Sequence, residues 1–142
     1  MSARSCPAAV VAALLLLCPA PLLADEAHHG QHEKCAKACA DCALKCSSCS
    51  AHCTHLVLDG KKEHAKTMRL CQDCAAICAT AAKVAGRVGP LAVTICESCA
   101  KCCDTCGKAC EEHPGDKHMA ECAKACKDCA KACREMIEHS KH

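Results

Sequence analysis

Cysteine takes the positions along this chain that larger apolar residues hold in most helical proteins. From Cys35 to Cys53 the cysteines recur at alternating intervals of four and three residues, the spacing that returns side chains to one face of a helix. Similar intervals recur in segments 71–78, 96–110 and 122–133. Charged residues occupy the intervening positions, so each segment is predicted to be an amphipathic helix whose buried stripe consists of thiols.

Turn-forming residues separate four such helices. The turn residues are Asp59-Gly60, Gly86, Gly89-Pro90 and Pro114-Gly115. Glycine closes helices and proline is disfavoured inside them. The predicted helices span about 33–58, 61–84, 90–112 and 116–138. Four helices joined by short turns predict an all-α fold, an antiparallel up-down-up-down four-helix bundle with a cysteine-lined core over residues 33–142.

The first 24 residues have the composition of a secretory signal peptide. Arg4 precedes an apolar run from Ala8 to Leu17, and Ala24 provides the small residue of a cleavage site. This run is shorter than the roughly 20 residues that span a bilayer, so we expect export to the periplasm or the exterior without a membrane anchor. Removal of residues 1–24 leaves nineteen of the twenty-one cysteines. Residues 25–32 are predicted to form a flexible, histidine-containing lead.

Composition and charge argue against several classes of protein. The chain has no Phe, Trp or Tyr, and its formal net charge is only +2, whereas nucleic-acid-binding proteins use basic surfaces and aromatic stacking. The sequence contains no recognisable catalytic triad or phosphate-binding glycine loop, and its CxxC pairs lie inside predicted helices rather than in the βαβ context of a thioredoxin-like motif. We therefore predict neither nucleic-acid binding nor enzymatic activity.

The thiols could serve packing, disulfide bonding or metal binding. A free cysteine packs as a small apolar residue, but leucine and isoleucine bury more apolar area. Disulfides suit an exported protein, yet residues three or four apart on a helix have Cβ atoms about 5–6 Å apart, and a disulfide needs about 3.8 Å. An odd number of mature cysteines also disfavours complete pairing. A thiol redox buffer stays open as an alternative to metal binding.

Thiolates are soft ligands that favour Cu(I), zinc and iron-sulfur clusters. Cu(I) can be held by two thiolates, so cysteine pairs on adjacent turns can each hold one ion. Zinc prefers a closed set of four ligands, and the sequence does not divide into such sets. The spacing of Cys96, Cys99, Cys102 and Cys106 matches a ferredoxin-type run, although Gly107 stands where that run has proline. An iron-sulfur protein therefore also stays open as an alternative to copper binding.

Eight CxxxC pairs fall in phase on the four predicted helices. They are Cys35/Cys39, Cys42/Cys46, Cys49/Cys53, Cys74/Cys78, Cys99/Cys103, Cys106/Cys110, Cys122/Cys126 and Cys129/Cys133. This pattern resembles that of the exported four-helix-bundle copper storage proteins, in which a cysteine-lined core holds many Cu(I) ions. The chain departs from that pattern in its larger number of cysteines and in a second helix with only three.

The resemblance implies copper storage and a set of ligands. The implied ligands are Cys35, Cys39, Cys42, Cys46, Cys49, Cys53, Cys71, Cys74, Cys78, Cys96, Cys99, Cys102, Cys103, Cys106, Cys110, Cys122, Cys126, Cys129 and Cys133. Two-thiolate coordination with some bridging predicts a capacity of roughly ten to nineteen Cu(I) ions per chain. The unit of binding is predicted to be a pair of thiols across one helical turn.

The sequence also suggests where the metal passes and what the chain meets. His64, Met68, His113 and Met119 fall at one end of the predicted bundle, and the resemblance implies that such weaker ligands surround the opening that admits copper. Ordinary surface histidines are the alternative interpretation. The resemblance is also consistent with a homo-oligomer such as a tetramer, and with a protein that delivers or receives copper.

Overall fold

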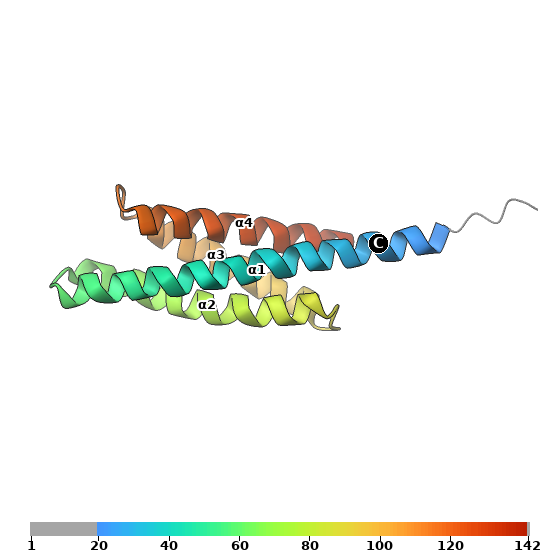
Figure 1. The fold of residues 1–142 in the computed structure, drawn as a ribbon, viewed down its shortest axis with the longest axis horizontal. Helices are drawn as coiled ribbons and strands as arrows, with labels where there is room; N and C mark the ends of the chain where they lie inside the picture. The colour runs from blue at the N-terminus through green and yellow to red at the C-terminus, as the bar shows by residue number, and fades with distance from the viewer. Residues whose placement is uncertain (1–19, 142) are drawn as a thin grey trace, which may run out of the picture.

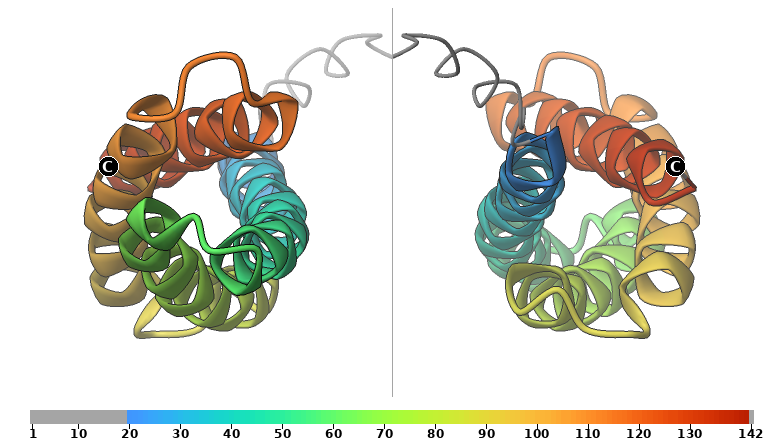
Figure 2. Two further views of the ribbon diagram at one scale, coloured as in Figure 1. Left: turned by 90° about the vertical axis from the view of Figure 1, so that its left-hand side faces the viewer. Right: turned by 90° about the vertical axis from the view of Figure 1, so that its right-hand side faces the viewer.

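The computed structural model describes residues 20–141, with side chains for residue 26 and residues 29–141. The helices are α1 (Ala20–Leu58), α2 (Ala65–Gly86), α3 (Ala92–Glu111) and α4 (Lys117–His139), and a 3-10 turn, η1 (Lys62–His64), precedes α2. They run antiparallel around one common axis (Figures 1 and 2). The predicted all-α four-helix bundle with a cysteine-lined core is therefore confirmed.

The bundle has two different ends (Figure 2). One end, here called the double-turn end, carries the connections α1–α2 (residues 59–64) and α3–α4 (residues 112–116). The other, the single-turn end, carries the α2–α3 connection (residues 87–91) and the end of α4. Helix α1 extends past the single-turn end (Figure 1).

The first helix begins earlier than the sequence predicted. Residues 25–32 were expected to form a flexible lead, but they belong to α1, which is 39 residues long. This segment contains no proline, and a helix already nucleated by a buried stripe extends readily through residues without a breaker. The glycine in the segment, Gly30, faces open space and does not interrupt the helix. Residues 1–19 of the predicted signal peptide lie outside the described residues, and the predicted cleavage point after Ala24 falls within α1.

The other helices begin slightly later than predicted, at positions that local chemistry explains. Gly89 and Pro90 lie in the connection before α3, where proline cannot donate a backbone hydrogen bond. Asp116 caps the N-terminus of α4, because its Oδ1 accepts hydrogen bonds from the backbone N–H groups of His118 at 2.8 Å and Met119 at 3.2 Å.

The end of α2 departs from the glycine closure that the sequence predicted. Gly86 is the last residue of α2, and the left-handed residue is Val88, with φ of 51°. The N–H of Val88 donates to the carbonyl of Ala85 at 2.9 Å, and the N–H of Gly89 donates to the carbonyl of Val84 at 3.0 Å. This is the hydrogen-bond pattern of a Schellman cap, but a β-branched residue occupies the position that glycine normally takes.

Sulfur fills the middle of the core, and aliphatic side chains close the single-turn end. Every described cysteine is buried except Cys102, which is half-buried. Ala81, Val84, Ala85 and Ile137 are buried toward the single-turn end. Cysteine is smaller than leucine, so the helices pack around a column of thiols instead of an aliphatic core.

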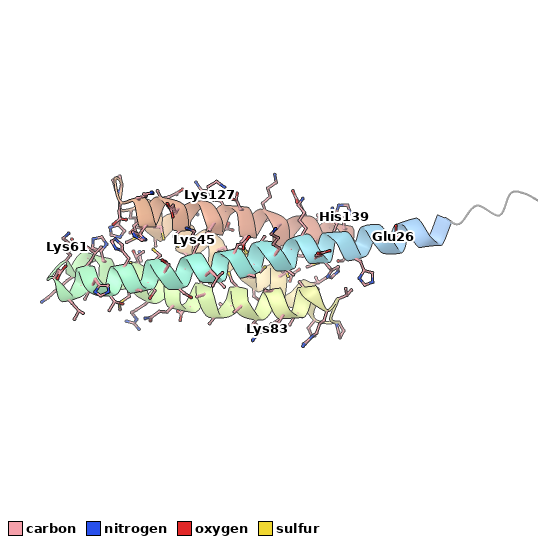
Figure 3. The ribbon with its side chains drawn as sticks, viewed as in Figure 1. Glu26, Lys45, Lys61, Lys83, Lys127 and His139 are labelled. Atoms are coloured by element: carbon pink, nitrogen blue, oxygen red, sulfur yellow. The ribbon has the colours of Figure 1, made fainter. Side chains whose placement is uncertain are left out.

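Charged side chains project from the outer faces of the helices (Figure 3). Lys45 and Glu121 form an ion pair of 2.7 Å between α1 and α4, and Lys34 and Glu135 form another of 3.1 Å. All four side chains are substantially exposed to water, so solvent screening leaves each pair little effect on stability. Within the part of the chain that the structure describes, no helix is long and apolar enough to cross a membrane.

Candidate metal centre

The predicted ligands form one continuous column of sulfur atoms. Neighbouring Sγ atoms lie between 3.5 Å apart, for Cys78 and Cys103, and 4.0 Å apart, for Cys35 and Cys39. All nineteen cysteines in the described residues are free thiols. A metal–sulfur bond is about 2.3 Å long in zinc thiolate sites, so a bond of that length allows one ion to join sulfur atoms up to about 4.6 Å apart. The column is therefore spaced for bridging by a soft metal ion.

The predicted pairs across one helical turn are present, but they are only part of the arrangement. The Sγ atoms of Cys35 and Cys39 lie 4.0 Å apart, and those of Cys74 and Cys78 lie 3.8 Å apart. Contacts between helices fall in the same range, from 3.5 Å for Cys78 and Cys103 to 4.0 Å for Cys39 and Cys99. A metal ion in this core therefore meets ligands from several helices at once.

Groups of four thiols from different helices converge in the core, with all Sγ atoms of a group within 4.8 Å of one another. They include Cys39/Cys99/Cys129/Cys133, Cys42/Cys74/Cys78/Cys103, Cys46/Cys106/Cys122/Cys126 and Cys49/Cys71/Cys110/Cys122. Linear spacing does not reveal these groups, because their members lie on different helices. Some thiols belong to two groups, as Cys122 does, so the column favours shared, bridging ligands over separate closed sites.

The ferredoxin-type run does not form a single site. Cys96 and Cys106 are ten residues apart on α3, which separates them by about 15 Å along the helix axis. Cys96 instead contacts Cys35 at 3.7 Å, and Cys106 contacts Cys71 at 3.6 Å. The spacing of this run therefore reflects the repeat of the helix, and the four thiols cannot hold one compact iron-sulfur cluster.

Hydrogen bonding between thiols divides them into better and poorer proton donors. The neighbouring Cys110 thiol lowers the pKa of Cys106 to about 6, and Cys103 does most to lower the pKa of Cys129 to about 6. Near the double-turn end, burial raises the pKa of the Cys53 thiol to about 12. Because the metal binds thiolate rather than thiol, its uptake displaces more protons at Cys53 than at Cys106.

Three of the four residues predicted at the opening make ring or sulfur contacts at the double-turn end. The rings of His64 and His113 stack with centroids 4.2 Å apart, and the Cys49 thiol contacts Met119 Sδ at 3.5 Å. The fourth, Met68, is half-buried against the core. The double-turn end therefore brings imidazole and thioether groups to one end of the thiol core.

The two stacked imidazoles are held differently. Burial lowers the pKa of His64, and the nearby His113 acts in the same direction, so both favour the neutral imidazole. Within the described part of the chain, Nδ1 of His64 has no hydrogen-bond partner, which leaves this nitrogen available to a metal. His113 Nε2 lies 3.0 Å from Thr67 Oγ1, and that hydroxyl also lies 3.4 Å from the carbonyl of Ala109. Thr67 thus orients the His113 ring.

A second pair of histidines lies at this end, next to Asp116, the residue that caps the N-terminus of α4. The rings of His52 and His118 stack at 4.4 Å, and His52 Nε2 lies 2.7 Å from Asp116 Oδ2. Burial alone would raise the pKa of Asp116, but hydrogen bonds from His52 and from the Met119 backbone N–H lower it. These contacts join α1 to the start of α4 and so fix the double-turn end. His55, by contrast, is exposed.

Residues 28–138 match the copper storage protein family. The chain belongs to the copper storage protein family. This match spans most of the chain and contains every cysteine of the sulfur column. No match to this chain was found among curated protein sequences.

Solved copper storage proteins have the same fold. The Cu(I)-bound copper storage protein BsCsp3 is 36% identical, with a TM-score of 0.69, and the match covers 75% of this chain and 98% of that protein. Apo copper storage protein 3 from Bacillus subtilis is 39% identical, with a TM-score of 0.64, and the match covers 74% of this chain and 97% of that protein. The first of these structures holds Cu(I), and the second is the apo form.

A relative from Streptomyces lividans adds information on loading. The copper storage protein Ccsp from that organism, loaded with 10 copper equivalents, is 30% identical, with a TM-score of 0.70, and the match covers 77% of this chain and 85% of that protein. A cytosolic copper storage protein from the same organism, captured with five coppers, is 29% identical, with a TM-score of 0.72, and the match covers 80% of this chain and 97% of that protein. The family therefore includes a cytosolic member, and membership alone does not imply export.

Proposed function

We propose that this protein stores Cu(I) ions along its thiol column. The observation that carries the proposal is the convergence of four-thiol groups from different helices, with all Sγ atoms of each group within 4.8 Å. A redox buffer does not require thiols to be buried in overlapping groups, whereas bridging coordination of a soft metal does. Copper is the stored species, and the protein performs no chemical conversion on it.

All nineteen cysteines of the described chain act as ligands in this proposal. Those in the column bind in pairs or groups of three and four and share sulfur atoms between ions. Cys102 is half-buried and lies one position off the stripe of α3, so it contributes less than the buried thiols. Two-thiolate coordination with bridging gives a capacity of roughly ten to nineteen ions. Loss of thiol protons offsets the positive charge that each ion brings.

Copper enters at the double-turn end, past His64, Met68, His113 and Met119. Imidazole and thioether bind Cu(I) more weakly than thiolate, so they can pass an ion to the thiols below without trapping it. The contact between Met119 Sδ and the Cys49 thiol at 3.5 Å supplies the first step of that transfer.

Residues 1–24 direct the protein out of the cytoplasm in this proposal. Their composition is that of a signal peptide, and the cytosolic relative from Streptomyces lividans makes location an independent question. Cell fractionation followed by N-terminal sequencing tests it. A mature protein that begins at Asp25 in the exported fraction supports the proposal, and an intact N-terminus in the cytosol contradicts it.

Anaerobic titration of the reduced protein with Cu(I), in competition with a chelator, tests the storage function. We expect tight uptake of roughly ten or more equivalents per chain. Saturation at one or two equivalents would contradict storage. Counting thiols before and after reduction in the purified protein tests the redox alternative, which requires a reversible set of disulfides. Storage requires the thiols to remain reduced in the copper-bound protein.

A further inference from the structure

The antiparallel register of α1 and α4 extends beyond the last thiol pair. Contacts between the two helices advance in equal steps: Cys46 with Cys122 at 3.7 Å, Cys42 with Cys126 at 3.8 Å, Cys39 with Cys129 at 3.6 Å and Cys35 with Cys133 at 3.8 Å. Each step of three or four residues backward on α1 matches an equal step forward on α4. The next step of three from Cys35 and Cys133 reaches His32 and Met136. The register therefore places these two residues at the same level.

His32 and Met136 are both buried. His32 is 4% exposed and Met136 is 0% exposed, although His32 lies in the segment that the sequence predicted to be a solvated lead. Small side chains take the corresponding positions on the other two helices. Ala92 on α3 and Ala85 on α2 are buried near this level, and neither adds a thiol. The single-turn end of the core therefore presents one imidazole and one thioether on its α1–α4 side.

The thiols next to His32 and Met136 are connected to the rest of the column. Cys35 Sγ lies 3.7 Å from Cys96 Sγ and 3.8 Å from Cys133 Sγ. Cys133 Sγ lies 3.6 Å from Cys39 Sγ, and Cys39 Sγ lies 4.0 Å from Cys99 Sγ. An ion that moves from thiol to thiol can therefore reach the single-turn end without leaving the core.

We propose that His32 and Met136 complete a terminal Cu(I) site at the single-turn end, together with Cys35 and Cys133. This inference rests on the proposed storage function and adds a mixed-ligand site to the thiol column. Imidazole, thioether and thiolate are all ligands that Cu(I) accepts. Cys35 and Cys133 also contact other thiols of the column, whereas His32 and Met136 are neutral ligands that add no negative charge to the terminal ion. The column thus ends without a further thiolate charge against the apolar side chains beyond it.

Selenium X-ray absorption on Met136 tests the site directly. In a protein with Met68→Leu and Met119→Leu, the remaining methionines are Met1 and Met136. Selenomethionine labelling of this variant therefore places the only selenium of the core at Met136. Leucine and methionine have similar volumes, so both changes largely preserve the packing of the core. After loading of the reduced protein with Cu(I), we expect a copper neighbour at bonding distance from selenium. The same protein with Met136→Leu added is the matched control and should lose this signal.

Copper capacity provides the second readout. We expect His32→Ala to lower the capacity by about one equivalent, because the terminal site loses its imidazole ligand. His29→Ala, one turn earlier on α1 at an exposed position, is the matched control and should keep the full capacity. Absence of a copper neighbour at Met136 selenium, in a protein that still takes up many equivalents, would overturn the terminal site and leave storage intact. Uptake of only one or two equivalents by the wild-type protein would overturn storage itself.

Discussion

The two ends of the bundle carry similar ligand types in different surroundings. At the double-turn end, His64, which is 8% exposed, stacks on the half-buried ring of His113 beside two connections and the polar cap at Asp116. At the single-turn end, His32 and Met136 are buried beside alanine, valine and isoleucine. The neighbours of a soft ligand, more than the ligand itself, therefore determine whether it can meet copper from solvent.

The ends also differ in how firmly they are closed. Apolar side chains at the single-turn end exclude water and bury area that favours folding. The double-turn end depends instead on hydrogen bonds, such as that between Thr67 and His113. We therefore expect copper to pass through the double-turn end and to stop at the single-turn end.

Removal of copper should have the largest effect, because the bound ions link the four helices between both ends. An ion present at 1,000 times its dissociation constant stabilises the folded state by about 4 kcal/mol per site, and a domain is stable by only about 5–15 kcal/mol in total. We expect the melting temperature of the loaded protein to exceed that of the reduced apo protein by about 20 °C or more. Circular dichroism on one preparation with and without copper measures this. Equal melting temperatures would contradict a filled core.

Lowering the pH should release copper near the double-turn end before it releases copper in the middle of the column. Cys53 has a pKa raised to about 12, so copper must displace its proton throughout the range below pH 12, and affinity there falls about tenfold per pH unit as the pH drops. Cys106 has a pKa lowered to about 6 and is mostly thiolate at pH 7, so its affinity falls only below pH 6. Between pH 8 and 6, copper near Cys53 should be released first.

Chelator capture of copper at stepped pH measures this release. Cys53→Ala should remove the earliest fraction, and Cys106→Ala should leave that fraction in place. Release of the same fraction at the same pH from both variants would show that the two regions do not differ in this way.

The rate of loading should depend on one end only. Replacing both His64 and His113 by alanine should slow Cu(I) uptake about tenfold, because ions lose the imidazoles that pass them to the thiols. The capacity should stay the same, since the thiol column is intact. Stopped-flow transfer from a coloured Cu(I)-chelator complex measures the rate. His139→Ala, an exposed histidine at the single-turn end (Figure 3), is the control. A wild-type rate in the double variant would place copper access elsewhere.

The smallest effect concerns the turns at the two ends. Gly60 holds a φ of 89° at the double-turn end, whereas Val88 holds a φ of 51° at the single-turn end. The left-handed conformation costs a residue with a side chain about 1–2 kcal/mol, and glycine loses part of this gain through its flexible unfolded state. Val88→Gly should therefore stabilise the apo protein by about 0.5–1 kcal/mol. Urea unfolding measures this, with Gly60→Val as the opposite change, which should destabilise. A lower stability of Val88→Gly would contradict strain at this turn.

The sequence predicted the fold because its signal is strong and local. Cysteines at helical intervals identify the buried face of each helix, and Asp59-Gly60 and Pro114-Gly115 identify the turns. Buried positions such as Cys39 and Cys126 follow directly from this periodicity. The same local signal placed the four helices, and with them the double-turn end that gathers His64 and Met119.

The remainder depends on contacts between helices, which spacing does not encode. Pairs such as Cys78 and Cys103, at 3.5 Å, exist only after α2 packs on α3, so the four-thiol groups were missed. The predicted start of α1 was wrong, because residues 25–32 are polar but contain no proline to end the helix. Counting back by three from Cys35 would have placed His32 on the buried stripe, so periodicity did contain that signal.

Diffraction at the copper absorption edge from crystals of the loaded protein would locate the bound copper ions. We expect anomalous peaks along the bundle axis, each within bonding distance of at least two core sulfur atoms. Copper bound only at surface histidines such as His55, or a core closed by disulfides without copper, would contradict this expectation.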